Sequence, residues 1–184
     1  HEVYSAAFKQ ANVIEAKDLE EFLDLCKCLS MIEPPKGDKV LIITNAGGFG
    51  VLASDEAEKC GIKLKEPSKK MKKALRKCFP KHVIISNPLD LTGDADFERY
   101  KITLEESFKE YDLILCIMLP QIPTIDERMY KALEELKERR MVCVIPGTYG
   151  EKWAKKVEKL GIPVYQTPER AVRVIASLLK KLKK

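Results

Sequence analysis

Short apolar, β-branched segments alternate with longer segments of helical periodicity from Lys39 onward, and this alternation constrains the fold more than any other feature. The segments expected to be strands are 40–43, 62–64, 83–85, 113–118 and 141–145, with 164–165 as an edge strand. The segments expected to be helices are 48–60, 68–79, 96–109, 125–140, 149–160 and 168–184. Strands joined by crossover helices pair in parallel with right-handed connections. The chain is therefore predicted to be an α/β protein.

The pattern narrows the choice to a doubly wound fold. Segment 113–118 is uniformly apolar, as expected of a strand with helices on both of its faces. Successive strand–helix units fit a flavodoxin-like, doubly wound parallel sheet of five strands. We predict the strand order 2-1-3-4-5, with helices on both sides of the sheet.

A proline-rich segment separates the N-terminal region from the alternating part. Residues 18–30 have the spacing of an amphipathic helix, for which Asp18 is a suitable N-cap. The following Glu-Pro-Pro-Lys-Gly-Asp sequence contains two prolines and a glycine, which interrupt regular structure. We therefore expect an N-terminal helical appendage at 1–33, a linker at 34–38 and the main domain at 39–184.

Composition and charge exclude several classes of protein. The chain has 184 residues, and no apolar run approaches the roughly 20 residues needed to cross a bilayer, so membrane insertion is not expected. No secretory signal is recognisable. The net charge of +5 derives mainly from Lys-rich stretches at 68–77 and 178–184, which we interpret as solvated helix faces. Aromatic residues are not interleaved with these lysines, so nucleic-acid binding is not expected.

The six cysteines lie in apolar segments and form no Cys-x-x-Cys pair. This usage is typical of buried thiols in a reducing compartment, so we predict a cytoplasmic location and no metal site. The chain begins at His1 rather than at a methionine, and we expect it to be a fragment of a longer protein. Part of the function is then expected to lie outside these residues.

Polar and glycine residues gather where the predicted strands end. Ligands of doubly wound sheets bind at the carboxyl ends of the strands. The loops at those ends are 44–50, 86–94, 119–121 and 146–148. The first of them joins a buried strand directly to a helix, so N–H groups of the first helical turn are expected to face outward at the positive end of the helix dipole. This loop is predicted to bind a phosphate.

The predicted phosphate-binding residues are Asn45, Gly47, Gly48, Gly50, Asn87 and Asp90. Glycines suit this role because a Cβ holds a phosphate oxygen away from the backbone and disfavours the positive φ angles of an amide nest. The loop is neither a Walker A sequence nor a Gly-x-Gly-x-x-Gly sequence. A tight turn without a ligand, and Asx-type capping of the loop that contains Asn87 and Asp90, are the alternatives.

Neither histidine is expected to be catalytic. His1 is the first residue, and His82 precedes the predicted strand 83–85, at the amino edge of the sheet and away from the phosphate loop. The sequence contains no Ser/His/Asp arrangement and no cluster of metal ligands. No catalytic residue is therefore assigned.

Four segments, in order along the chain, resemble NDP-forming acyl-CoA synthetases. They are 2–14 (EVYSAAFKQANVI), 44–51 (TNAGGFGV), 87–95 (NPLDLTGDA) and 161–172 (GIPVYQTPERAV). The resemblance covers nearly the whole chain and is strongest to the α subunit of the ADP-forming acetyl-CoA synthetases, which are relatives of succinyl-CoA synthetase.

The resemblance implies a larger enzyme that interconverts acyl-CoA, ADP and phosphate with free acid, ATP and CoA through a phosphohistidine. Residues 1–33 then correspond to the end of the histidine-bearing ligase domain, and 39–184 to the second, flavodoxin-like ligase domain. The amides of Gly47, Gly48 and Gly50 would hold the phosphate of the phosphohistidine. This segment is expected to bind no cofactor beyond phosphate, whereas CoA, ADP or ATP, and Mg belong to the complete enzyme.

Essential parts of that enzyme do not appear in this sequence. The family's Ser-His-Thr-Gly-Ser stretch, which carries the phosphorylated histidine, is absent, and His1 does not match it. The expected partners are the histidine-bearing ligase domain, the CoA-binding domain and an ATP-grasp domain or subunit. The chain alone is predicted not to catalyse the full reaction.

Two other functions remain open on the same fold. An FMN-binding electron-transfer domain would need aromatic side chains beside the flavin, but the sole tryptophan, Trp153, is expected within a helix. A receiver-type or other non-catalytic interaction module would need an acidic cluster after the first strand, where the sequence has Thr44 and Asn45.

Overall fold

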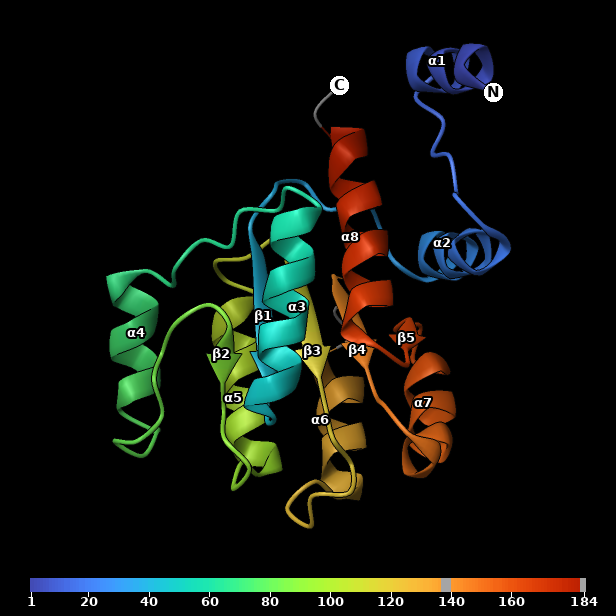
Figure 1. The fold of residues 1–184 in the computed structure, drawn as a ribbon. Coiled ribbons are helices and arrows are strands. Elements are labelled where there is room, and N and C mark those ends of the chain that lie inside the picture. Colours follow the sequence, from blue (N-terminus) through green and yellow to red (C-terminus); the bar gives the residue numbers. More distant parts are fainter. Residues whose placement is uncertain (137–139, 183–184) are drawn as a thin grey trace.

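A computed structural model describes residues 1–136 and 140–182, which contain one five-stranded sheet with the order β2-β1-β3-β4-β5 (Figure 1). The strands are β1 (Val40–Thr44), β2 (Leu89–Asp90), β3 (Leu113–Ile117), β4 (Met141–Val144) and β5 (Val164–Tyr165). All four pairs of neighbouring strands are parallel. The strand order reverses between β1 and β3, as in other doubly wound sheets. The predicted fold class and strand order are confirmed.

Two of the predicted strands are wrong. Segments 62–64 and 83–85 form no strand, and the second strand of the sheet comes instead from Leu89 and Asp90, which had been expected in a loop. Val83 and Ile85 are nevertheless buried in the core of one sheet face. The apolar residues of these segments therefore cover the sheet without pairing with it.

Asn87 explains why β2 is so short. Its side-chain Oδ1 accepts the N–H of Ile42 at 3.1 Å, and its Nδ2 donates to the carbonyl of Val40 at 2.8 Å. A carboxamide thus satisfies the edge of β1 where a backbone strand would otherwise pair. Backbone pairing begins only afterwards, with Ile43 opposite Leu89.

Most helices agree with the predicted segments to within a few residues. They are α1 (Glu2–Gln10), α2 (Leu19–Met31), α3 (Gly47–Lys59), α4 (Lys69–Arg76), α5 (Phe97–Ser107), α6 (Glu127–Leu136), α7 (Glu151–Glu158) and α8 (Pro168–Leu182), with a 3₁₀ helix at Thr148–Gly150. Asp18 caps α2 as predicted, because its side chain accepts the N–H of Glu21. The predicted helices at 125–140 and 168–184 extend over residues 137–139 and 183–184, which lie outside the described residues.

Helices cover both faces of the sheet. α4, α5, α6 and α7 lie on one face, where Leu75 and Leu104 are among the buried side chains. α2, α3 and α8 lie on the other face, with Ala57 and Ile175 in the core. All residues of β1 and β3 are buried, as predicted for central strands covered on both sides. None of the helices in the described ranges is long and apolar enough to span a membrane.

The two N-terminal helices differ in their contacts. α2 packs on the sheet through Leu25 and Cys28, and the hydroxyl of Tyr165 donates to the carbonyl of Asp24 at 2.8 Å. α1 lies apart from the sheet (Figure 1), and none of its residues 2–10, all of them described, is buried. The division into 1–33, 34–38 and 39–184 stays a prediction.

Candidate anion site at the start of α3

The turn between β1 and α3 is fixed by Thr44, the last residue of the strand. Its Oγ1 accepts the N–H of Ala46 and donates to the carbonyl of Ala46, both at 3.0 Å. The carbonyl of Ala46 also accepts the N–H groups of Phe49 and Gly50, at 3.0 and 3.3 Å. These contacts hold Ala46 at the N-cap position and define the direction in which α3 starts.

Within the described residues, the first two N–H groups of α3 find no acceptor. Ala46 has an extended backbone and no side-chain atom that could cap the helix. Gly47 and Gly48 are exposed, and in the part of the chain that the structure describes their N–H groups donate to no protein acceptor. Two exposed donors at the positive end of a helix dipole attract an anion.

The glycines do not form the predicted nest of positive φ angles. Gly47, Gly48 and Gly50 have helical backbones, and the glycines with positive φ are elsewhere in the chain. The expectation was wrong because a strand can enter a regular helix through an extended N-cap residue, here Ala46, without left-handed residues.

At two of the three positions a Cβ would meet other parts of the protein, which is a different constraint from the predicted access of a phosphate oxygen to the backbone. A Cβ on Gly50 would lie 3.1 Å from Cγ2 of Thr44, so Gly50 allows α3 to approach β1 closely. A Cβ on Gly47 would lie 2.8 Å from Oδ2 of Asp90. A Cβ on Gly48 would meet nothing within 4 Å, so this glycine leaves space in front of the helix rather than inside the protein.

Asp90, one of the predicted phosphate-binding residues from the loop 86–94, lies next to the start of α3. Its Oδ1 accepts the N–H of Thr92 at 2.8 Å, which forms the Asx-type turn considered as an alternative. Its Oδ2 faces Gly47 and has no hydrogen-bond partner among the described residues. A carboxylate at this place competes electrostatically with a bound anion.

The two asparagines have other roles. Asn45 is 2% exposed, its Oδ1 accepts the N–H of Leu119 at 3.1 Å, and its Nδ2 has no partner in the described structure. It therefore joins the loops that follow β1 and β3. Asn87 is occupied by β1 and by the carbonyl of Lys65, to which its Nδ2 donates at 2.9 Å. The structure does not bring Asn87 to the start of α3.

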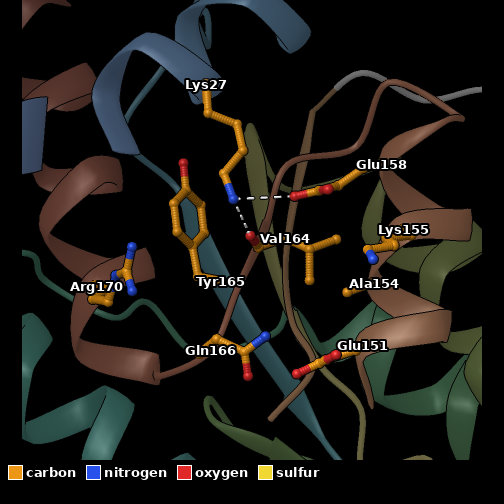
Figure 2. A pocket seen from close by; sticks show the side chains of 9 residues that line it. All are labelled: Lys27, Glu151, Ala154, Lys155, Glu158, Val164, Tyr165, Gln166 and Arg170. Carbon is orange, nitrogen blue, oxygen red and sulfur yellow. Dashed lines mark hydrogen bonds and ion pairs between the residues drawn. The ribbon is translucent and has the colours of Figure 1, made fainter. Parts of the chain in front are cut away.

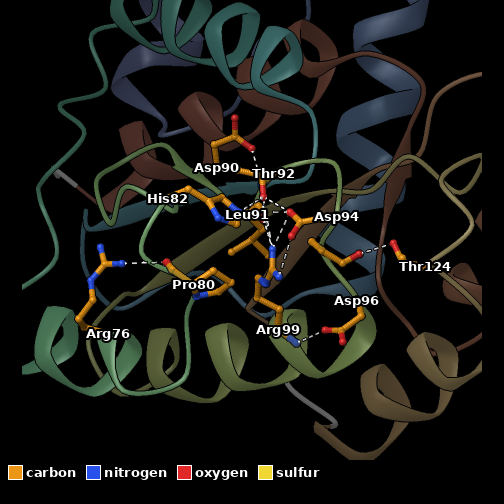
Figure 3. Close-up of polar contacts among 11 residues, drawn as sticks. Arg76, Pro80, His82, Asp90, Leu91, Thr92, Asp94, Asp96, Arg99 and Thr124 are labelled. Carbon is orange, nitrogen blue, oxygen red and sulfur yellow. Dashed lines mark hydrogen bonds and ion pairs between the residues drawn. The ribbon is translucent and has the colours of Figure 1, made fainter.

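His82 lies at the carboxyl edge of the sheet, not at the amino edge where the sequence placed it. Figure 3 shows it beside the loop that follows β2, with its Nε2 3.5 Å from Oγ1 of Thr92 and 3.5 Å from Oδ1 of Asp94. The placement was wrong because it assumed a strand at 83–85. Without that strand, the chain folds back along the loop after β2.

Arg99 organises this loop from the first turn of α5. Its Nη1 donates to the carbonyl of Leu91 at 2.7 Å and to Oδ1 of Asp94 at 3.0 Å (Figure 3). Hydrogen bonds from Arg99 and Thr92 hold the pKa of the Asp94 carboxyl far below its usual range. The loop beside the anion site is therefore a hydrogen-bonded unit.

A cavity of about 190 Å³, separate from the start of α3, lies where β5 ends, between α2, α7 and α8 (Figure 2). Lys27 reaches into it, with its Nζ 3.1 Å from Oε1 of Glu158 and 4.6 Å from the centre of the Tyr165 ring. Arg170, at its rim, donates two hydrogen bonds to the carboxylate of Asp24. These charges are paired within the protein and attach α2 to α7 and α8. Sequence reasoning missed this cluster, since its members are far apart in the chain.

Comparison with known proteins agrees with the sequence resemblance. The α subunit of ADP-forming acetate–CoA ligase I from Pyrococcus furiosus is 32% identical over 97% of this chain, which covers 40% of that subunit. The ADP-forming acetate–CoA ligase of Methanocaldococcus jannaschii is 36% identical over 97% of this chain, which covers 27% of it. The chain thus spans well under half the length of these relatives.

Solved structures give the same result. The dinucleotide-forming acetyl-coenzyme A synthetase 1 of Ca. Korarchaeum cryptofilum, in complex with phosphate and ADP, superposes with a TM-score of 0.88 at 26% identity. The match covers 98% of this chain and 41% of that one. A family model described as the Ligase-CoA domain matches residues 40–133, just over half of this sequence. The chain therefore belongs to the Ligase-CoA domain family.

Proposed function

We propose that this chain is part of an ADP-forming acyl-CoA ligase and that the start of α3 holds the phosphoryl group of its phosphohistidine. The complete enzyme would convert acyl-CoA, ADP and phosphate into acid, ATP and CoA. The observation that carries the proposal is the pair of exposed N–H groups at Gly47 and Gly48, which no acceptor in the described structure satisfies. The phosphate bound in a structural relative is consistent with it.

The proposed reaction requires fixed hydrogen-bond donors around the phosphoryl group. A phosphoryl group that is held between acyl phosphate and nucleotide carries negative charge spread over several oxygens. Fixed N–H dipoles stabilise that charge without reorganising during the reaction. Gly48 leaves the approach to these dipoles open, because no atom from beyond its own helical turn lies within 4 Å of the place where its Cβ would be.

The N-terminal region supports the proposal that a histidine-bearing domain precedes the sheet. Large apolar side chains of α1 and of the outer side of α2 are exposed, namely Val3, Tyr4, Phe8, Leu19, Phe22 and Leu23. An open groove runs between the two helices. Exposed apolar surface of this extent marks an interface. We propose that residues 1–33 complete that preceding domain.

We assign the binding of the other reactants to domains outside this chain. We propose that CoA binds to the CoA-binding domain, and that ADP or ATP with Mg binds to an ATP-grasp domain or subunit. Cys26 and Cys78 are exposed rather than buried as predicted, but all six cysteines are free thiols, which supports a cytoplasmic location. No observation favours the FMN alternative, since Trp153 is half-buried against the core of the face covered by α7.

Gly48→Val in the complete enzyme tests the proposal. The side chain of a residue in the first helical turn points back toward the N-terminus, so valine would crowd the two amides. We expect the KM for phosphate to rise about tenfold, with the free energy of unfolding changed by less than about 0.5 kcal/mol. The assay is phosphate- and ADP-dependent release of CoA from acetyl-CoA, with thermal unfolding measured in parallel.

Gly93→Val is the matched control. A Cβ on Gly93 also meets nothing within 4 Å, but Gly93 lies in the loop after β2 and not in α3. The control is expected to retain the normal KM for phosphate. Normal turnover and a normal KM in Gly48→Val would contradict the proposed role of α3.

A further inference from the structure

A basic surface with few counter-charges lies at the β2 side of the sheet. We define the basic edge as Lys69, Lys70, Lys72, Lys73, Arg76, Lys77 and Lys81, on α4 and the segment that follows it. Residues 67–89 contain no Asp or Glu. These seven cations exceed the net charge of +5 of the whole chain, so the other residues together carry −2. The basic edge is therefore a strong local concentration of positive charge, distinct from the second Lys-rich stretch at 178–184.

Few of these cations have partners within the protein. Lys72 pairs with Glu66 at 2.7 Å, and Arg76 donates to the carbonyls of Pro80 and Val83 at 3.0 and 2.7 Å. The other five, all lysines, form no ion pair with any residue that the structure describes. Buried Met71 and Leu75 attach α4 to the core and leave these five lysines exposed. Such a concentration of unpaired charge attracts an acidic partner.

An unpaired backbone edge lies next to the basic edge. Segment 83–85 alternates in burial, with Val83 at 0%, Ile84 at 74% and Ile85 at 7% exposure. This alternation is characteristic of an extended chain. In the described structure, the backbone groups of Ile84 and Ile85 form no hydrogen bond to the protein. The segment, which connects α4 to β2 in Figure 1, therefore resembles an uncovered edge strand.

The helix and the segment together form an open groove. It is lined by Lys72, Lys73, Arg76, Lys81, Val83, Ile84 and Ile85. Figure 3 shows Arg76, one of these residues, extended toward the carbonyl of Pro80. One wall is cationic, and the other offers an apolar side chain and free peptide groups.

We propose that this groove binds an extended, acidic segment of another protein by strand addition along residues 83–85. Main-chain hydrogen bonds to Ile84 and Ile85 would supply affinity, as in other cases of β-augmentation. An apolar side chain of the segment would pack on Ile84, and its carboxylates would face the lysines of α4. Among the described residues, no Phe, Tyr or Trp side chain lines the groove for stacking on bases, and Phe79, in the same segment, is only 6% exposed. These features favour a protein segment over a nucleic acid.

The test uses the 184-residue chain and a nine-residue peptide of alternating Glu and Val with blocked ends. We expect binding with a Kd on the order of 100 µM at low salt, and amide NMR shifts centred on Ile84 and Ile85. Raising the salt to about 0.5 M should weaken binding at least about fivefold. A peptide of the same sequence that is N-methylated at alternate residues keeps its charge but cannot pair its backbone. It is expected to bind at least about tenfold more weakly.

Charge-reversed variants locate the surface. Lys73→Glu/Lys77→Glu is expected to weaken peptide binding at least about tenfold. Lys155→Glu/Lys159→Glu on the α7 side makes the same change in net charge at the same spacing and is expected to leave binding within about twofold. Equal binding by the N-methylated peptide would overturn strand addition. Tighter binding of a single-stranded oligonucleotide at this groove, or no peptide binding at about 1 mM, would overturn the proposed partner.

Discussion

α3 and α5 begin in opposite ways, although both follow strands at the same edge of the sheet. Asp96 caps α5, because its Oδ1 accepts the N–H of Arg99 at 2.9 Å. At the start of α3 the equivalent position is Ala46, whose side chain has no atom that could accept a hydrogen bond. One helix start is closed by its own sequence, and the other leaves its N–H groups available.

A capped helix start contributes to stability, whereas an uncapped start leaves N–H groups that can bind a ligand. α2 and α4 begin like α5, with caps from Asp18 and Ser68, so closed starts are common in this protein. A side-chain cap typically contributes about 1 kcal/mol to stability. The alanine at the start of α3 forgoes that contribution and keeps two N–H groups for a ligand. We interpret the open start as a functional feature, and the predictions below test this comparison.

Closing the start of α3 is expected to have the largest effect. In Ala46→Asp, a carboxylate at the N-cap can accept the N–H of Gly48 or Phe49 and repels an incoming anion. Phosphate affinity, measured from the NMR shifts of the Gly47 and Gly48 amides in this chain, should fall at least about thirtyfold. Stability should rise by about 1 kcal/mol in urea unfolding.

Ala46→Asn is the control for charge. It can cap the helix without adding a negative charge, so we expect a smaller loss of phosphate affinity, about fivefold, and a similar gain in stability. Wild-type affinity in both variants would mean that phosphate does not bind to these amides.

Removing the carboxylate next to Gly47 should increase the difference in anion binding between the starts of α3 and α5. Asp90→Asn retains an oxygen that can accept the N–H of Thr92, but it removes the negative charge that faces Gly47. Phosphate affinity in the same NMR titration should rise about fivefold, which corresponds to about 1 kcal/mol. Asp96→Asn makes the same charge change at α5 and should leave the affinity unchanged. Weaker binding by Asp90→Asn would identify Asp90 as a hydrogen-bond acceptor from a protonated phosphate.

Opening the start of α5 should affect stability alone. Asp96→Ala removes the cap and leaves the N–H of Arg99 without its acceptor. The free energy of unfolding in urea is expected to fall by about 1 kcal/mol, with phosphate affinity unchanged. Asp96→Ser, which keeps a capping oxygen, should recover most of that loss. A drop in phosphate affinity with Asp96→Ala would show that the two helix starts are coupled.

Asp94 is expected to give the smallest effect, and one that depends on pH. Its pKa is lower in the folded protein than in the unfolded chain, mainly because Arg99 donates to it, so its contribution to stability is present above the unfolded pKa of about 4. That contribution is lost as the pH falls below this value. The difference in unfolding free energy between the wild type and Asp94→Asn should therefore be small but measurable at pH 7 and should decrease toward pH 3. A difference that grows toward low pH would contradict a lowered pKa of Asp94 in the folded protein.

The sequence predicted the elements whose signals are local. β1, β3 and β4 are runs of apolar residues, and the starts of α2 and α5 carry Asp18 and Asp96 as caps. Segment 83–85 has an equally apolar sequence, yet it forms no strand. Local composition indicates that residues will be buried, but it does not distinguish pairing with the sheet from packing against it.

The candidate site was also predicted only where its signals are local. The glycines at the start of α3 follow from a strand that runs directly into a helix, and this is visible in sequence. Asn87 looked like a ligand because it follows a predicted strand, but its carboxamide pairs with β1, about 45 residues earlier in the chain. The nearness of His82 to Asp94 likewise depends on where the chain folds back.

The sequence by itself determined the α/β alternation, the buried central strands and the uncapped glycine-rich start of α3, since each depends on residues close together in the chain. Only the tertiary structure decided that Leu89 and Asp90 form the edge strand, that Asn87 substitutes for backbone pairing, and that Asp90 faces Gly47. These outcomes depend on hydrogen bonds between distant segments. Which of these bonds form depends on the whole fold, because each buried polar group on the edge of β1 must find a partner somewhere in the chain.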